Sequence, residues 1–231
     1  MRLINVSNPN APSELSNFYT AGGAEDIAID GHYAYLAATT AGLRILNIAN
    51  PALPTQASLL DTPNSARGVT VENGYAYVAD EYGGLRIINV SNPTSPFEVG
   101  FFDPLGSGPA YAVAISGNYA FVAYGYDGIR VLNISDKTKP TLVYTLDTYG
   151  ASDIELYGWL AVVADQSYVL LVDVSNPAHP TILDSYTVPF YALELDMVRN
   201  YIFVAGQTSG VYTLRIAGLK ELYLPVVRRT P

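Results

Sequence analysis

The side chains with the greatest capacity for chemistry are four carboxylates in segments that vary along the chain. Asp80, Glu81, Asp127 and Asp165 could bind Ca²⁺, or two of them could act as a glycosidase pair. Most of them lie far apart in the sequence, so only the fold could bring them together. The closely spaced Asp-x-Asp-x-Asp pattern of a calcium loop is absent. We therefore expect structural or solvated carboxylates, with no catalytic residue and no metal site.

Histidine and cysteine chemistry has little support in this sequence. The two histidines, His32 and His179, fall in turn segments of different parts of the chain. The chain has no cysteine, which excludes thiol catalysis and Cys-ligated zinc. It also lacks the His-Glu-x-x-His, Gly-x-Ser-x-Gly and phosphate-loop patterns. We predict a protein that has no cofactor and is not an enzyme.

A repeat of 42 residues organises the whole chain. An Asn-Pro dipeptide places Pro9, Pro51 and Pro93 at this interval, and Pro177 follows after two further periods. Fixed periods of this length are typical of repeat folds, in which each unit is one supersecondary structure. The repeat therefore predicts one architecture over residues 1–231 and a single domain.

Each repeat contains four short apolar runs that are separated by turn residues. In the second unit the first two runs, 69–71 and 75–79, are joined by Asn73-Gly74, the strongest short-range signal for a β-hairpin. The third run ends at an Asn-Pro segment, where proline cannot donate to a strand ladder. Four antiparallel strands in a unit of this length predict one blade of an all-β propeller. A β-solenoid, whose rungs are shorter, is the weaker alternative.

The number of blades follows from the first strand of each unit. These inner strands are expected to begin near Ile27, Val69, Val113, Ile154 and Leu193, which predicts five blades.

Both ends of the chain add strands to this count. Residues 3–6 and 13–19 resemble the third and fourth strands of a unit, and 222–227 resemble a further strand. Either the N-terminal strands complete the last blade, or they belong to an incomplete sixth blade. We therefore expect residues to be missing upstream of Met1. We assign residues 219–231 to a C-terminal strand or tail.

The composition excludes two classes of partner. The net charge is −9 and only 12 residues are Lys or Arg, whereas nucleic acids and anionic lipids are bound by clustered cations. No apolar run approaches the ~20 residues of a membrane-spanning helix. We expect a monomer that neither binds nucleic acid nor inserts into a membrane.

The repeat resembles a known family at particular residues. The segments 171–177 (LVDVSNP) and 87–93 (IINVSNP) resemble the LVIVD repeat, and a matching Tyr-Ala-Tyr-Val-Ala-Asp stretch occupies 75–80. The resemblance covers nearly the whole chain. It implies a β-propeller of an exported or cell-surface protein from bacteria or archaea, and it transfers no catalytic residues. An extracellular or cell-surface location is therefore expected, although this chain shows no signal peptide.

One face of the predicted propeller carries loops that differ in every unit. A rigid scaffold with one variable loop face is how repeat folds usually host binding. The residues expected nearest the central opening are Glu25, Arg67, Tyr111, Ser152 and Tyr191, with Tyr82, Tyr124 and Tyr126 in neighbouring loops. Tyrosines offer a large contact area at low entropic cost, which suits protein or glycan ligands. The alternative is that these tyrosines only pack the loops.

These observations predict a non-enzymatic interaction module that binds a protein or a glycan through its variable face. Two other functions remain open. The chain could be a polysaccharide lyase or hydrolase that uses carboxylates and tyrosines around the central opening. It could also be a structural spacer without a ligand.

Overall fold

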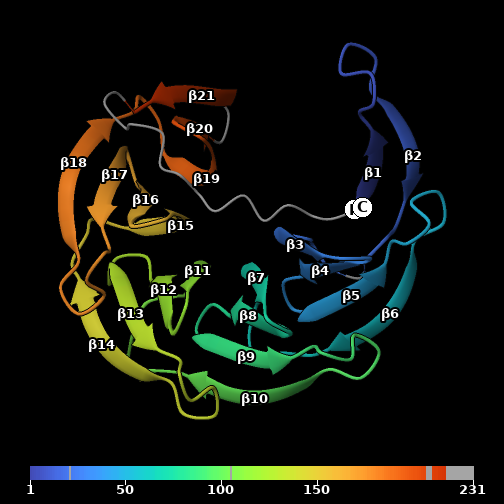
Figure 1. Ribbon diagram of the computed structural model, residues 1–231, viewed down its shortest axis with the longest axis horizontal. Coiled ribbons are helices and arrows are strands. Elements are labelled where there is room, and N and C mark those ends of the chain that lie inside the picture. The colour runs from blue at the N-terminus through green and yellow to red at the C-terminus, as the bar shows by residue number, and fades with distance from the viewer. Residues whose placement is uncertain (21, 105, 207–209, 217–231) are drawn as a thin grey trace.

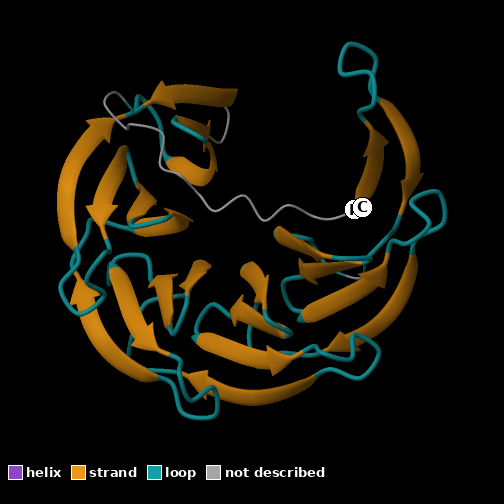
Figure 2. Ribbon diagram, in the orientation of Figure 1, coloured by secondary structure: helices purple, strands orange, loops and turns teal. Residues whose placement is uncertain are grey.

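The computed structural model describes residues 1–20, 22–104, 106–206 and 210–216. These residues form 21 β-strands and no helix (Figure 2). Since they include no helix, the described part of the chain has none that could cross a membrane. The predicted C-terminal strand and tail, 219–231, lies outside the described residues.

Four successive units each fold into a four-stranded antiparallel sheet in which chain neighbours are sheet neighbours (Figure 1). The first blade is β3 (Asp26–Asp30), β4 (Tyr33–Ala37), β5 (Leu43–Asn47) and β6 (Thr55–Leu60). The second is β7 (Gly68–Glu72), β8 (Tyr75–Ala79), β9 (Leu85–Asn89) and β10 (Phe97–Phe102). The third is β11 (Ala112–Ser116), β12 (Tyr119–Ala123), β13 (Ile129–Asn133) and β14 (Thr141–Leu146). The fourth is β15 (Ala151–Tyr157), β16 (Leu160–Asp165), β17 (Tyr168–Asp173) and β18 (Thr181–Thr187).

A fifth unit continues the series around a common centre. In its described residues it contributes three strands, β19 (Ala192–Val198), β20 (Tyr201–Gly206) and β21 (Gly210–Arg215). The first strands of the five units, β3, β7, β11, β15 and β19, contact one another in succession and surround the centre (Figure 1). The chain is thus a five-bladed β-propeller with a repeat of about 42 residues, and the predicted fold is confirmed.

The N-terminal strands β1 (Arg2–Asn5) and β2 (Ser13–Asn17) form a separate two-stranded sheet beside the first blade. The Ser16 hydroxyl donates to the Pro51 carbonyl at 2.6 Å, as the Ser58 hydroxyl donates to the Pro93 carbonyl between the first two blades. β1 and β2 therefore contact the first blade in the same way that the third and fourth strands of a blade contact the following blade. Within the described residues they do not pair with β19–β21, so they do not complete the fifth blade.

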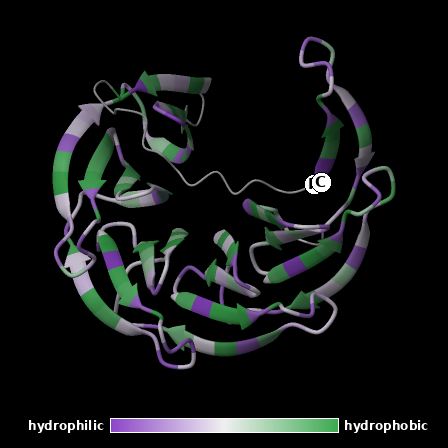
Figure 3. Cartoon of the chain, in the orientation of Figure 1, coloured by the Kyte–Doolittle hydropathy of each residue, from purple (hydrophilic) through white to green (hydrophobic). Residues whose placement is uncertain are grey.

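The hydrophobic core lies between neighbouring blades. Tyr35 and Ile45 of the first blade pack in one cluster with Val78 and Ile88 of the second. Both faces of a blade's middle strands are therefore buried, and β4 and β8 read as nearly continuous apolar runs rather than alternating ones. Figure 3 shows the hydrophobic residues concentrated along the strands of the blades.

The recurring Asn-Pro dipeptide closes the turn between the third and fourth strands. The Asn50 side-chain oxygen accepts the N–H of Ala52 at 3.1 Å, and its carbonyl accepts the N–H of Leu53 at 2.9 Å. Asn8, Asn92 and Asn176 repeat both bonds. Where the dipeptide is missing, Asp136 takes the same role toward Thr138. In each unit, therefore, an Asn or Asp side chain stabilises the turn by accepting a backbone N–H from the same turn.

A glycine opens the third strand because two strands approach closely there. Gly84 has a φ of 73°, and a Cβ at this position would overlap the carbonyl oxygen of Phe102 at the end of β10. Gly42 and Gly128 meet the ends of β6 and β14 in the same way. A side chain would clash with backbone at these sites, so glycine is required in each of these blades.

Candidate functional site

The main candidate site is a central cavity of about 710 Å³. Residues of all five inner strands line it, together with the loops that precede these strands. Cavities of this size suit small ligands or a side chain of a partner. The cavity therefore lies where the variable face meets the centre of the ring.

Seven of the eight residues predicted for the site line this cavity. They are Glu25, Arg67, Tyr82, Tyr111, Tyr126, Ser152 and Tyr191. Tyr82, Tyr126 and Tyr191 expose 62%, 78% and 52% of their surface, so each is accessible to a partner. The fold thus brings residues from five units to one opening.

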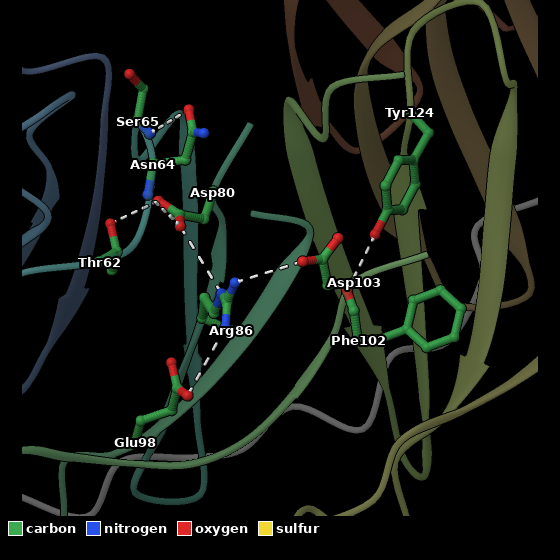
Figure 4. Close-up of polar contacts among 9 residues, drawn as sticks. All are labelled: Thr62, Asn64, Ser65, Asp80, Arg86, Glu98, Phe102, Asp103 and Tyr124. Atoms are coloured by element: carbon green, nitrogen blue, oxygen red, sulfur yellow. Dashed lines mark hydrogen bonds and ion pairs between the residues drawn. The ribbon is translucent and has the colours of Figure 1, made fainter. Parts of the chain in front are cut away.

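The eighth residue, Tyr124, is in the core, and its predicted place on the binding face is wrong. It is 1% exposed, and its hydroxyl donates to the Phe102 carbonyl at 3.4 Å (Figure 4). The Arg130 guanidinium lies 4.7 Å from its ring centre. The first residue of this loop still continues the strand and bonds to Gly128, so its side chain packs between blades. Tyr126, two residues later, is the one that is exposed.

Backbone pairs between blades hold the loops of the opening. Glu81 and Ala110 exchange two N–H···O bonds of 3.1 and 2.9 Å, which link the loop of Tyr82 to the next inner strand. Gly125 and Ala151 exchange two bonds of 3.0 Å. Such pairs between two segments restrict loop motion. The loops that contain Tyr82 and Tyr126 are therefore held in place by backbone hydrogen bonds.

The register of the fifth blade differs from the prediction. Ser152 is the extra residue of a bulge between Ala151 and Asp153, and the residue in the same place of the fifth blade is Leu193. Tyr191 therefore lies two residues earlier than the equivalence we expected, although it still lines the cavity with Leu193. The buried alanines Ala151 and Ala192 share this register, and their alignment in the sequence could have revealed it.

The variable-loop carboxylates hold loops in place, as expected. Asp80 is fully buried and accepts bonds from the Thr62 hydroxyl at 2.5 Å and the Asn64 N–H at 2.9 Å (Figure 4). Asp165 accepts the N–H groups of Tyr149 and Gly150.

The other two variable-loop carboxylates pair with arginines. Asp127 accepts the N–H of Gly108 at 2.7 Å and pairs with Arg130 at 3.1 Å. Glu81 pairs with Arg67 at 3.1 Å. Among the described residues, no group of three His, Cys, Asp or Glu is placed to hold a metal.

A second set of carboxylates on the inner strands was missed by the sequence analysis. Asp26, Asp153, Glu155 and Glu194 all line the cavity. Burial raises the pKa of Asp153 to about 6, and burial together with the charges of Asp153, Asp196 and Asp26 raises the pKa of Glu155 to about 7. These residues come from β3, β15 and β19, so carboxylates of different blades repel one another across the opening.

Two of these carboxylates also join adjacent blades. Asp26 accepts the N–H of Val69 at 2.8 Å, and Asp153 accepts the N–H of Leu195 at 2.6 Å. Each bond connects one inner strand to the next, because the acceptor and the donor belong to neighbouring blades. Asp26 and Asp153 thus have a structural role as well as a place in the cavity wall.

The raised pKa values predict that the folded protein is more stable at pH 5.5 than at pH 8. Because the pKa values of Asp153 and Glu155 lie above those of the unfolded chain, the folded state binds more protons in this range. Their contribution to stability is complete at low pH and is lost as the pH rises through about 6 and about 7. Thermal unfolding at both pH values measures the difference. Glu155→Gln should reduce it, and an unchanged pH dependence in this variant would contradict the assignment.

Comparison with known proteins gives both a family and a fold. The LVIVD repeat model matches residues 21–62, 63–103, 107–148 and 150–188. No curated protein matches the chain.

Several solved structures are similar in fold at low sequence identity. A functionally unknown protein from Desulfotomaculum acetoxidans DSM 771 has a TM-score of 0.78 and 15% identity, covering 93% of this chain and 75% of that one. The β-propeller domain of Cps50 (Swd1) from Myceliophteria thermophila has a TM-score of 0.70 and 12% identity, covering 90% and 72%. The computationally designed Ika8 protein has a TM-score of 0.62 and 9% identity. There the match covers 82% of this chain and only 57% of the designed one.

These structural likenesses show the fold alone, because the identities are low. The repeat matches cover more than half of the chain and coincide with its first four complete blades. The chain belongs to the LVIVD repeat family.

Proposed function

We propose that this propeller is a non-enzymatic interaction module that binds a protein or a glycan at the mouth of its central cavity. The observation that carries the proposal is the set of exposed tyrosines, Tyr82, Tyr126 and Tyr191, around a cavity of about 710 Å³. Exposed aromatic rings on fixed loops provide contact area at low entropic cost. We further propose that the module is monomeric and acts outside the cell or at the surface of a prokaryotic cell.

The test of this function compares tyrosines inside and outside the site. A glycan array and a peptide display library supply the ligands, and the affinity of the best binder is measured for each variant. Tyr111→Ala and Tyr191→Ala should each weaken binding about tenfold. Tyr186→Ala on β18 is the matched control, because Tyr186 is 53% exposed and Tyr191 is 52% exposed. Equal effects of Tyr186→Ala and Tyr191→Ala, or no effect of any change, would refute the site.

The second candidate function is a polysaccharide lyase or hydrolase. The observation in its favour is Glu155, whose pKa of about 7 suits a general acid near neutral pH, beside Asp153 in the same cavity wall. Release of reducing ends or unsaturated products from a polysaccharide panel would support it. Turnover that survives Glu155→Gln would exclude Glu155 as the acid.

A further inference from the structure

We propose that the central cavity receives a cationic side chain, the ammonium of a lysine or the guanidinium of an arginine presented by a partner protein. This inference rests on the proposed function and narrows it to one ligand chemistry. It depends on the charge of the cavity wall, the aromatic residues at its mouth and the size of the opening.

The cavity wall is strongly acidic. Among the described residues that line it, the carboxylates are Glu25, Asp26, Asp153, Glu155 and Glu194, and Arg67 is the one cation. Arg67 already pairs with Glu25 at 3.5 Å and with Glu81 at 3.1 Å. Its charge is therefore not available to Asp26, Asp153, Glu155 and Glu194.

The four carboxylates of the inner strands have no cationic partner in the described part of the chain. Asp26 and Asp153 accept backbone N–H groups, and neither Glu155 nor Glu194 forms an ion pair there. The carboxylates come from β3, β15 and β19, and partial loss of hydration inside the cavity raises the pKa values of all four, although Asp26, Glu155 and Glu194 keep exposed surface. A bound cation would offset both the repulsion and the loss of hydration.

The mouth of the cavity suits the same kind of ligand. Tyr82, Tyr111, Tyr126 and Tyr191 line it, and aromatic rings attract ammonium and guanidinium groups through their negative faces. A cation that bound against these rings would also be near the carboxylates that line the same cavity. A neutral glycan could stack on the tyrosines, but it would not offset the negative charge of the cavity wall.

The opening favours a side chain on a protein over a free amine. A cavity of about 710 Å³ is larger than one lysine or arginine side chain, so the loop that carries the side chain can enter with it. The exposed tyrosines would then contact the surface of the partner. This agrees with the general enrichment of tyrosine in protein interfaces.

The experiment uses short peptides that differ only in the central side chain. Acetylated Gly-Gly-X-Gly-Gly amides with X as arginine, lysine, citrulline or norleucine are titrated into the whole chain at pH 8, with detection by NMR. Citrulline and norleucine keep the shape of arginine and lysine without the charge. The charged peptides should bind about tenfold more tightly than their neutral analogues. Equal binding of charged and neutral peptides would overturn the inference.

A pair of charge-neutralising variants tests the location. Glu155→Gln should weaken binding of the arginine peptide about tenfold. Glu72→Gln removes the same charge at the far end of inner strand β7, outside the cavity lining, and should change the affinity less than about twofold. Equal losses in both variants would show attraction to the net negative charge of the protein and would overturn the site.

The affinity should also fall when the pH is lowered from 8 to 5.5. The charges that act on Glu155 are those of Asp153 on its own strand, Asp196 on β19 and Asp26 on β3. The other titratable or charged groups of the same cavity wall are Glu194 on β19, Glu25, Tyr82, Tyr111, Tyr126, Tyr191 and Arg67. Protonation of Glu155 and Asp153 in this range removes the negative charge that the cation requires. An affinity independent of pH would contradict the role of these carboxylates.

Two further probes distinguish a free polyamine from a partner protein, and the cation-binding inference from the proposed function. Spermidine binding more than about tenfold more tightly than the lysine peptide would assign the cavity to a free polyamine and overturn the partner-protein assignment. A neutral oligosaccharide that binds in a Tyr111-dependent way, with no cation binding, would overturn this inference and leave the proposed function intact. A partner that binds independently of Tyr111 and Tyr191 would overturn both.

Discussion

Replacing Asp80 by alanine is expected to lower the free energy of unfolding by about 3 kcal/mol. The carboxylate is fully buried and accepts bonds from the Thr62 hydroxyl and the Asn64 N–H (Figure 4). It is also 3.8 Å from Arg86, whose side chain is 7% exposed. Alanine would leave two donors and a buried guanidinium without this acceptor, and such losses are among the largest single-site effects. Chemical unfolding followed by circular dichroism measures the change.

Two variants test whether the loss in Asp80→Ala comes from the buried carboxylate itself. Asp80→Asn keeps one acceptor oxygen, so its loss should be smaller than that of Asp80→Ala. Asp103 lies 4.0 Å from Arg86, but its side chain is 36% exposed, and Asp103→Ala should cost less than about 1 kcal/mol. If Asp80→Ala were as mild as Asp103→Ala, Asp80 would not hold the loop before the second inner strand.

Replacing Tyr77 by alanine is expected to lower the free energy of unfolding by about 4 kcal/mol. Tyr77 is 2% exposed and packs in one cluster with Val113, Val122 and Leu132 of the next blade. Truncation would remove a large buried ring and leave a cavity between the second and third blades. Because each blade packs only on its neighbours, nothing else can fill this interface.

The matched control is Tyr82→Ala, five residues later in the same blade. Tyr82 is 62% exposed, so its removal should change stability by less than about 0.5 kcal/mol. If Tyr77→Ala and Tyr82→Ala had equal effects, the interface between blades would not be the main source of stability.

Most of the fold could be predicted because its signals are local. The Asn73-Gly74 pair has positive φ at both residues, as the tight hairpin requires, and this turn is encoded by two adjacent residues. The Asn50 turn is likewise closed by local bonds, from the N–H groups of Ala52 and Leu53. Signals of this range repeat every 42 residues, so the blade and its strand order follow from the sequence.

The candidate site could be predicted only in part. The position before each inner strand correctly indicates Glu25, Arg67 and Tyr111 as lining residues. In the fifth blade the residue equivalent to Ser152 is Leu193, two residues after Tyr191, so Leu193 was missed. Leu193, Leu195 and Met197 alternate with acidic residues, so a shift of two residues leaves the apolar pattern of the strand unchanged. Tyr124 and Tyr126 are also two residues apart, so periodicity alone does not separate the buried tyrosine from the exposed one.

The sequence by itself determined the repeat, the four-stranded blade, the turns and the face that carries variable loops. The tertiary structure alone decided that Asp26, Asp153, Glu155 and Glu194 meet around one cavity. In the sequence each is one acidic residue near a strand, and the first and the last are 168 positions apart. Their mutual repulsion and raised pKa values arise only when the blades close around a common centre, because charges interact over distance in space and not along the chain.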